Sequence, residues 1–167
     1  MIPTGIITVG TFPSGGAFQT SGGPSVRAAV AVLGWRTIAE AIVPDELEQI
    51  ARTVLDFSRM GCQLILTIGG IGISGRDVTP EAVRSIARFE IPGFGESMRT
   101  QSKNCSSNAI LSRSVGAVVK NSLVITLPGA PAGVIECLGF VTPVIPRTVE
   151  LLICGSIGID TLKQLHA

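Results

Sequence analysis

The segment from Gly69 to Ala82, GGIGISGRDVTPEA, constrains the fold of this chain more than any other stretch. It follows the apolar run LILTI at 64–68, which is typical of a buried strand. It leads into Thr79-Pro80, a cap residue and a first-turn proline that open a helix. Because four glycines in the loop let backbone N–H groups approach an anion, the loop and helix N-terminus predict a phosphate site. Asp77 lies in the same loop, where a carboxylate can hold a magnesium ion.

Composition limits the class of protein. The chain has 167 residues, of which 46% are apolar and 15% are charged. These values predict one folded domain that is heavily buried or oligomeric. The formal net charge is +1 and only 4% of the residues are aromatic. We therefore expect no nucleic-acid partner, because neither phosphate neutralisation nor base stacking has the side chains it needs.

The cysteines and the single histidine narrow the chemistry further. Cys62, Cys105, Cys137 and Cys154 show no close spacing, so neither a zinc ribbon nor a redox pair is indicated. Free cysteines fit a reducing cytoplasm. His166 stands next to the C-terminus, which argues against histidine-based catalysis. The N-terminus lacks a signal-peptide pattern, and no run approaches about 18 apolar residues, so no membrane partner is expected.

Strand and helix patterns alternate through the first half of the chain. The predicted elements are a strand at 5–10, a helix at 24–33, a strand at 35–43, a helix at 44–60, a strand at 63–68 and a helix at 80–88. This alternation predicts a parallel sheet with helices on both faces.

The second half is less regular but completes the same architecture. Residues 117–120 and 123–126 flank Asn121-Ser122 and resemble a β-hairpin. Helices are expected at about 133–140 and 143–154, followed by a polar tail, and residues 155–167 are predicted to be mobile. The fold class is thus a three-layer α/β/α domain spanning residues 1–167, with a mostly parallel sheet and a small β-hairpin.

Two carboxylates are expected at one edge of this sheet. Asp45 follows the second predicted strand and Asp77 follows the third. If these strands run parallel, both side chains lie beyond their carboxyl ends, where open α/β sheets bind ligands. The Gly/Ser-rich loop at 11–23 reaches the same edge from the first strand. Such a crevice has the groups needed to bind a nucleotide phosphate with Mg²⁺.

Each of these features also has a purely structural interpretation. Asp45 precedes Glu48 in a pattern that resembles a capping box, so helix capping explains it as well. Asp77 fits an Asx turn, and Arg76 fits a solvated surface position. The remaining candidates can be loop or turn residues: Gly69, Gly70 and Gly72 through tight packing, Ser112, Arg113 and Ser114 as loop polar groups, and LPGAP at 127–131 as a turn. The sequence leaves these alternatives open.

Several stretches in a fixed order carry a resemblance to a known family. They are VPDE at 43–46, GGIGISGRDVTPEA at 69–82, PGFGESMR at 92–99, ILSRSVG at 110–116 and LPGAP at 127–131. Together they resemble the molybdopterin adenylyltransferase family, single-domain enzymes of molybdenum cofactor biosynthesis, over about residues 4–154. The resemblance implies a cytoplasmic homotrimer that transfers AMP from MgATP to the terminal phosphate of molybdopterin and releases pyrophosphate. It also implies a protein partner that inserts molybdate.

The same resemblance assigns roles to individual residues. Asp45 and Asp77 match the family's catalytic acidic residues and would hold Mg²⁺. The substrate-binding positions implied are Gly69, Gly70, Gly72, Ser74, Gly75, Arg76, Thr79, Ser112, Arg113, Ser114, Pro128 and Gly129.

The chain also departs from the family pattern. Ile71 stands where the family usually has threonine, Gly10-Thr11 replaces a Ser-Asp pair, and Thr20 or Ser21 stands where a further aspartate is expected. Two hypotheses follow: an active adenylyltransferase, or a non-catalytic molybdopterin-binding or carrier paralogue that has lost groups of the ATP site. A purely structural trimer is a third, weaker idea, which rests on the apolar fraction alone.

Overall fold

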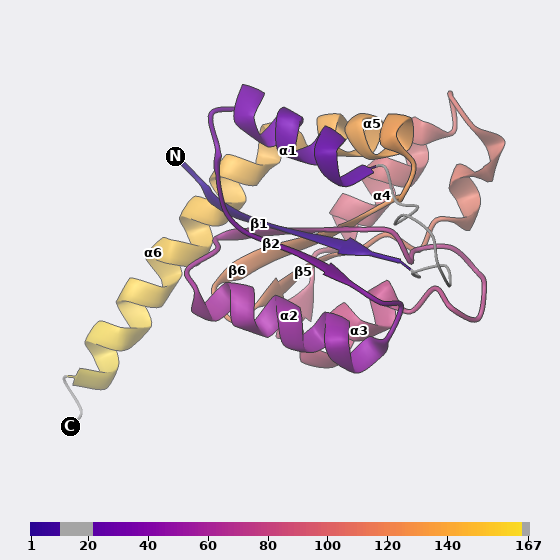
Figure 1. Cartoon of the computed structure of the whole chain (residues 1–167). Coiled ribbons are helices and arrows are strands. Elements are labelled where there is room, and N and C mark those ends of the chain that lie inside the picture. The colour runs from indigo at the N-terminus through magenta and orange to yellow at the C-terminus, as the bar shows by residue number, and fades with distance from the viewer. Residues whose placement is uncertain (11–21, 165–167) are drawn as a thin grey trace.

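The protein is a three-layer α/β/α domain built on a six-stranded mixed sheet (Figure 1). The computed structural model describes the backbone of residues 1–10 and 22–164 and the side chains of 1–10 and 22–155. Across the sheet the strand order is β2-β1-β3-β6-β5-β4. The strands are β1 (Pro3–Val9), β2 (Arg36–Val43), β3 (Leu64–Ile68), β4 (Phe89–Glu90), β5 (Gly116–Val119) and β6 (Ser122–Leu127).

Four neighbouring strands, β2, β1, β3 and β6, run parallel, and β5 and β4 are antiparallel to their neighbours. The predicted hairpin is confirmed as β5 and β6, which are joined through Lys120 and Asn121. Lys120 has a φ of 53°, the left-handed conformation that a two-residue hairpin turn requires. The turn therefore lies one residue earlier than the sequence predicted.

Helices cover both faces of the sheet. On one face lie α1 (Gly22–Val32), α4 (Pro92–Ser102), α5 (Pro131–Val141) and α6 (Ile145–Gln164), and on the other lie α2 (Leu47–Arg59) and α3 (Thr79–Ile86). Two 3₁₀ segments, η1 (Ser107–Leu111) and η2 (Thr142–Val144), complete the chain. Each face has its own apolar core, one containing Val26, Met98 and Leu138 and the other Ile50, Val54 and Val83.

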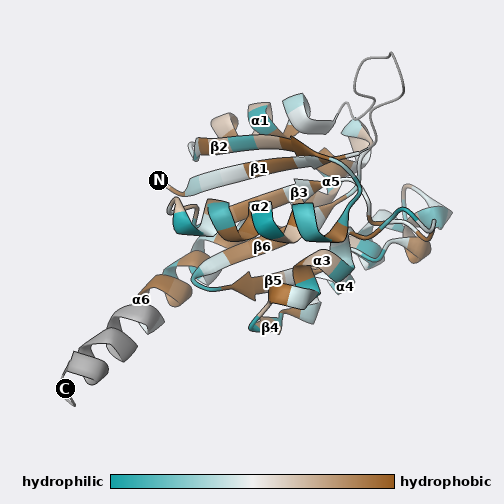
Figure 2. Cartoon of the chain, turned by 60° about the horizontal axis from the view of Figure 1, so that its bottom comes forward, coloured by the Kyte–Doolittle hydropathy of each residue, from teal (hydrophilic) through white to brown (hydrophobic). Residues whose placement is uncertain are grey.

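The second helix shows how the apolar spacing fixes its position. Ile50, Val54 and Phe57 recur at helical intervals and are all buried against the sheet. The opposite face of α2 is hydrophilic, as the teal segments of its ribbon in Figure 2 show. Burying each of these side chains contributes about 1.5–3 kcal/mol, which is enough to hold the helix in this orientation.

The C-terminal helices form the most apolar part of the described chain. By length and composition alone, Pro131–Gly155 is able to cross a membrane. Val134, Leu138 and Ile145, however, are buried in the core on one face of the sheet. The helix expected at about 143–154 is longer than predicted, because α6 continues to Gln164 and leaves the body of the domain (Figure 1).

The cysteines are all free, as the sequence predicted. Cys62 and Cys137 are buried, whereas Cys105 and Cys154 are exposed. Burial raises the pKa of the Cys62 thiol to about 11, so that side chain behaves as a small apolar group in the core.

Candidate functional site

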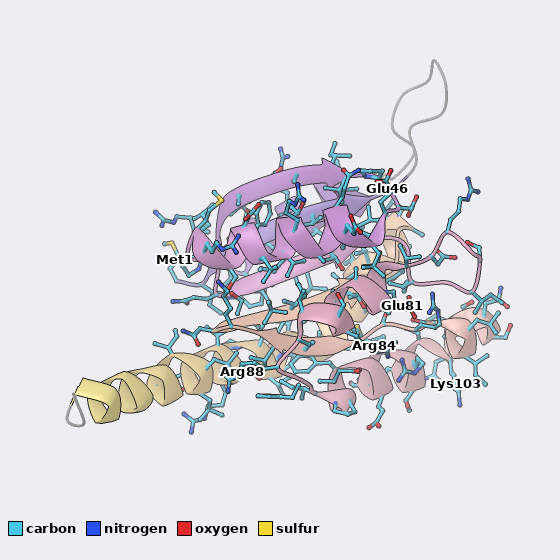
Figure 3. All side chains as sticks on the ribbon, turned by 90° about the horizontal axis from the view of Figure 1, so that it is seen from below. Met1, Glu46, Glu81, Arg84, Arg88 and Lys103 are labelled. Atoms are coloured by element: carbon cyan, nitrogen blue, oxygen red, sulfur yellow. The ribbon has the colours of Figure 1, made fainter. Side chains whose placement is uncertain are left out.

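The parallel strands deliver their carboxyl ends to one edge of the sheet. From β1 the chain crosses to β2 on one side, and from β3 it proceeds toward the opposite side, so the strand order reverses between β1 and β3. Ligands bind open α/β sheets at such a switch point. Glu46 before α2 and Glu81 in the first turn of α3 lie at the same end of the molecule (Figure 3). The loop at 11–21 lies outside the described residues.

The glycine-rich loop has a fixed backbone shape. Gly69 and Gly70 have φ values of 101° and 66°, a conformation that other residues rarely adopt. The Gly69 amide donates to Leu127 O at 2.9 Å, and the Thr79 amide donates to Gly70 O at 3.1 Å. The first bond ties the loop to the end of β6, and the second closes it onto the start of α3.

Both predicted aspartates approach this loop. An ideal Cβ built on Gly70 would lie 3.5 Å from Asp45 Oδ1, and one built on Gly72 would lie 2.9 Å from Asp77 Oδ2. Two carboxylates from different parts of the chain therefore meet one three-residue stretch of backbone. Asp45 and Asp77 are both half-buried, so the two carboxylates share one rim of the domain.

Asp77 also stabilises the loop that carries it. Ser74 donates to Asp77 Oδ2 through its amide at 2.9 Å and its hydroxyl at 2.6 Å. Partial burial alone would raise the pKa of the Asp77 carboxyl. The hydrogen bonds from Ser74 and from the Gly72 backbone, together with the charge of Arg113, outweigh it and hold that pKa below its usual range. The side chain is thus an anion at neutral pH, and the turn-stabilising interpretation holds alongside any catalytic one.

The capping predictions made for this edge are wrong. The N-cap of α2 is Glu46 rather than Asp45, and the N-cap of α3 is Val78 rather than Thr79; neither makes a side-chain cap bond. Thr79 instead lies inside the first turn, fully buried, and its Oγ1 has no hydrogen-bond partner among the described residues. A Cβ on Gly70 would collide with this hydroxyl, so glycine is required there for a second, steric reason.

Arg113 holds the loop from a distant part of the chain. Its Nε donates to Gly72 O at 2.6 Å, one terminal nitrogen donates to Asp77 O, and the other pairs with Glu81. Its backbone amide donates to Ile71 O at 3.0 Å. The guanidinium is therefore used within the protein, so the structure makes Arg113 a positioning residue for the loop.

The other predicted site residues lie at several places around the glycine-rich loop. Ser112 and Pro128 line a pocket beside the loop, whereas Ser114 is buried, with its hydroxyl accepting a bond from Ser112. Gly75 and Arg76 lie at the exposed tip of the loop. Gly129 O lies 2.8 Å from the point where a Cβ on Gly22 would be, which brings LPGAP against the start of α1.

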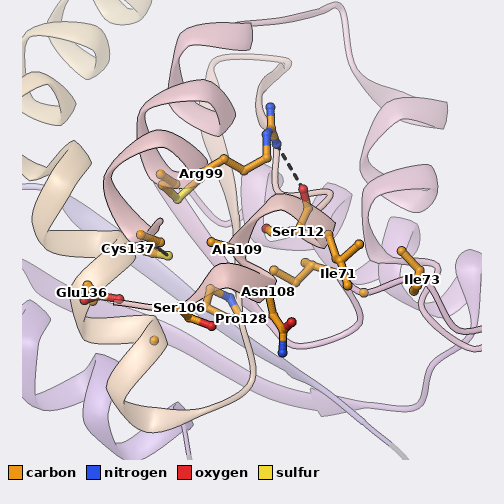
Figure 4. A pocket seen from close by; sticks show the side chains of 15 residues that line it. Ile71, Ile73, Arg99, Ser106, Asn108, Ala109, Ser112, Pro128, Glu136 and Cys137 are labelled. Atoms are coloured by element: carbon orange, nitrogen blue, oxygen red, sulfur yellow. Dashed lines mark hydrogen bonds between the residues drawn. The ribbon is translucent and has the colours of Figure 1, made fainter. Parts of the chain in front are cut away.

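The pocket beside the loop has a volume of about 370 Å³ (Figure 4). Its walls come from the loop, α4, η1, the Ser112 segment and α5. The lining residues are Ile71, Gly72, Ile73, Met98, Arg99, Ser102, Ser106, Asn108, Ala109, Leu111, Ser112, Pro128, Gly133, Glu136 and Cys137. Because Ile71 and Gly72 belong to both features, the anion loop and the pocket form one continuous site.

Arg99, Asn108 and Glu136 are lining residues that sequence reasoning missed. Arg99 belongs to the PGFGESMR stretch, and in the structure its Nη1 donates to Ser114 O at 3.0 Å and to Ser112 O at 3.4 Å. That stretch was the one signal available for it. Asn108 and Glu136 had no signal, because only the tertiary fold brings η1 and α5 to the same cavity.

Comparisons with known proteins agree with this geometry. Residues 5–147 match the family described as "Probable molybdopterin binding domain". Molybdopterin adenylyltransferase of Haemophilus influenzae is 38% identical over 141 residues, covering 83% of this chain and 72% of that protein. The Helicobacter pylori protein of the same name is 34% identical over 155 residues, covering 91% and 88%.

Solved structures show the same fold. The molybdopterin biosynthesis enzyme MoaB from Thermus thermophilus has a TM-score of 0.83 at 37% identity, covering 91% of this chain and 96% of that one. The molybdopterin biosynthesis Mog protein from Mycobacterium ulcerans has a TM-score of 0.84 at 27% identity, covering 91% and 99%. These relatives confirm the resemblance to molybdopterin adenylyltransferases that the motifs indicated. The match over residues 5–147 shows that this chain belongs to the molybdopterin-binding domain family.

Proposed function

We propose that this protein is a molybdopterin adenylyltransferase, which transfers AMP from ATP to the terminal phosphate of molybdopterin and releases pyrophosphate. One observation carries the proposal: Asp45 and Asp77 converge on the backbone at Gly70 and Gly72, where a helix begins. Helix N-termini and glycine-rich backbone bind phosphate groups. The names of the relatives from Haemophilus influenzae and Helicobacter pylori support the same reaction.

The reaction needs positioned charge rather than a general base. A phosphate oxygen of molybdopterin forms a bond to the α-phosphorus of ATP while the bond from that phosphorus to the bridging oxygen breaks, and pyrophosphate leaves with the electron pair. The attacking phosphate is already ionised at neutral pH. The chain's one histidine, His166, is therefore not needed for the step. The amides of Gly69, Gly72 and Ser74 donate within the protein. Other backbone amides of the loop, those of Gly70, Ile71 and Ile73, would hold the reacting phosphates in line.

The residues at this edge fit a magnesium ion. Asp45 Oδ1 and Thr79 Oγ1 both lie close to the point where a Cβ on Gly70 would be, and Thr79 Oγ1 has no hydrogen-bond partner among the residues that the structure describes. Asp77 adds a carboxylate at Gly72. These are hard oxygen donors of the kind Mg²⁺ prefers. The described residues contain no cluster of three acidic, histidine or cysteine ligands. Substrate phosphates would therefore supply the remaining ligands of the ion, as is usual for Mg²⁺. When bound, Mg²⁺ would neutralise charge on the triphosphate and the leaving pyrophosphate.

The carrier alternative is less well supported than the enzyme. It rested on Ile71, Gly10-Thr11 and Thr20. Thr11 and Thr20 lie outside the described residues, whereas the Gly10 amide donates to Val43 O at 3.0 Å. Ile71 is only 7% exposed and its carbonyl accepts from the Arg113 amide, so the loop keeps its shape without a threonine hydroxyl. Both carboxylates remain in place beside it.

The direct test combines purified protein, molybdopterin, ATP and Mg²⁺ and measures adenylylated molybdopterin and pyrophosphate by chromatography. We expect product with the wild type, much less with Asp77→Asn, and wild-type yield with Asp56→Asn, a matched change at the surface of α2. Calorimetric titration with ATP should show tighter binding when Mg²⁺ is present. No product above background, with Asp77→Asn equal to the wild type, would contradict the proposal.

The proposal extends to assembly and surroundings. We propose a cytoplasmic homotrimer whose adenylylated product passes to a separate molybdate-inserting protein. Large apolar side chains on the outside of the domain support the assembly, since Val32, Val144 and Leu151 are 89%, 53% and 54% exposed. Where exposed apolar side chains form a contiguous patch, they commonly mark an interface with another subunit. Free cysteines support a reducing compartment.

A further inference from the structure

We propose that Glu136 selects the pterin of molybdopterin by accepting hydrogen bonds from the pyrimidine edge of its ring. This inference rests on the proposed function for the identity of the ligand, and it assigns the far end of the site to a specific part of that ligand.

The pocket has two chemically different ends. Ile71 and Ile73 of the glycine-rich loop lie at one side, and Glu136 and Cys137 of α5 lie at the opposite side (Figure 4). A ligand whose phosphate is held by the loop therefore extends its other end toward α5. In molybdopterin the phosphate and the pterin are at opposite ends of the molecule, which matches this layout.

The wall between the two ends suits a flat ring. Apolar side chains supply most of the lining: Ile71, Ile73, Met98, Ala109, Leu111 and Pro128. Ligand pockets commonly combine such walls with a few convergent polar groups that fix orientation. The volume of about 370 Å³ is large enough for a fused pterin ring system with its substituent.

Glu136 is the only carboxylate among the described residues that line the pocket. The other charged side chain there is Arg99, which is engaged by the carbonyls of Ser112 and Ser114. Glu136 is half-buried in the pocket lining and forms no ion pair with any described residue. The Glu136 carboxylate raises the pKa of the exposed Cys105 thiol through a hydrogen bond and through its charge, so it lies beside that thiol. The group is therefore able to accept bonds from a ligand.

The pterin edge is complementary to a carboxylate. A pterin presents N3–H and the 2-amino group side by side, so the two oxygens of Glu136 can accept two parallel hydrogen bonds. Adenine presents its amino group between two acceptor nitrogens, so a carboxylate meets at least one unfavourable contact. Glu136 thus favours the pterin over the adenine of ATP at this end of the pocket.

The first test separates substrate binding from chemistry. Compared with the wild type, Glu136→Gln should raise KM for molybdopterin about ten- to a hundredfold, because an amide replaces one acceptor with a donor. KM for ATP and kcat at saturating molybdopterin should remain unchanged. The matched control is Glu96→Gln on α4, an exposed carboxylate outside the pocket lining, which should behave as the wild type. An unchanged KM for molybdopterin in Glu136→Gln would overturn the inference while leaving the proposed function intact.

The second test needs no catalysis. Binding of pterin and of lumazine, in which a carbonyl replaces the 2-amino group, is measured by ligand fluorescence. The wild type should bind pterin about tenfold more tightly, and Glu136→Gln should lose that preference, because its amide can donate to the carbonyl. Equal affinities in the wild type, an unchanged preference in Glu136→Gln, or no saturable binding of pterin would each count against the inference. If the wild type forms no adenylylated product yet shows the Glu136-dependent preference, the proposed function fails and the pterin subsite stands.

Discussion

Asp77 both stabilises the glycine-rich loop through Ser74 and supplies a negative charge to the proposed magnesium site. A conservative substitution can separate these two roles. An asparagine at this position can still accept from the Ser74 amide and hydroxyl, so Asp77→Asn should alter the free energy of unfolding by less than about 1 kcal/mol. It removes one carboxylate of the proposed magnesium site, so kcat/KM for adenylylation should fall about a hundredfold or more. Steady-state kinetics with thermal unfolding would check both expectations. A large loss of stability with unchanged kinetics would make Asp77 a structural residue only.

The pH dependence of stability follows from the same carboxyl. Its pKa is lowered in the folded protein, so its contribution is fully present above the unfolded value of about 3.9 and is lost as pH falls through the folded pKa. The difference in unfolding free energy between wild type and Asp77→Asn should therefore be constant from about pH 5 to 8 and change only below about pH 4. Urea unfolding at a series of pH values measures it. A change between about pH 5 and 7 would contradict the assigned pKa direction.

A substitution of Arg113 tests whether the glycine-rich loop needs contacts from a distant part of the chain to keep its shape. Arg113→Lys keeps the charge but cannot reach the Gly72 carbonyl, the Asp77 carbonyl and Glu81 together. We expect a loss of about 2 kcal/mol in stability, faster amide exchange at 69–78 and a lower kcat. Hydrogen-exchange mass spectrometry would locate the change. Arg59→Lys, on the exposed side of α2, is the matched control and should leave exchange in the loop unaltered.

At the scale of the element, the junction between β3 and α3 depends on where its glycines stand. Gly70→Ala places a Cβ on a residue with φ of 66° and against Thr79 Oγ1, so we expect loss of ATP binding and a stability cost above about 2 kcal/mol. Gly75→Ala adds a Cβ that meets nothing within 4 Å, so stability should be unchanged or slightly higher. Calorimetry of both variants would distinguish them. Equal effects would show that the loop shape is not decisive.

The elements also show what sequence reasoning can reach. Strands β1, β2 and β3 and helix α2 were predictable because their apolar residues follow a regular period or form a short continuous run. Strand β4 was not, since its two residues, Phe89 and Glu90, are both exposed and give no alternation. The shared position of the Asp45 and Asp77 carboxylates was predictable, because the carboxyl ends of parallel strands lie at one edge of the sheet. The contacts of Arg113 were not, because they join residues 32 to 41 positions apart.

At the scale of the whole molecule, the exposed apolar side chains on the C-terminal helices test the proposed trimer. Light scattering of the wild type should give three times the chain mass of 17.3 kDa. Leu151→Glu places a charge on α6 where the side chain is 54% exposed, so it should shift the mass toward one chain without unfolding the domain. Thr148→Glu places the same charge on the same helix but replaces a polar side chain, so the mass should remain that of the wild type. A wild type of one chain mass at micromolar concentration would refute the assembly.

The contacts of Arg113 also determine when the glycine-rich loop can take its final shape during synthesis of the chain. A ribosome that has released only the first hundred residues has already exposed β1, β2 and β3, but not the guanidinium that fastens the Gly72 and Asp77 carbonyls. The partner strand β6, which lies beside β3 at the centre of the sheet, emerges later still. The proposed ATP site of a nascent chain is therefore incomplete, and we expect truncated products not to bind ATP.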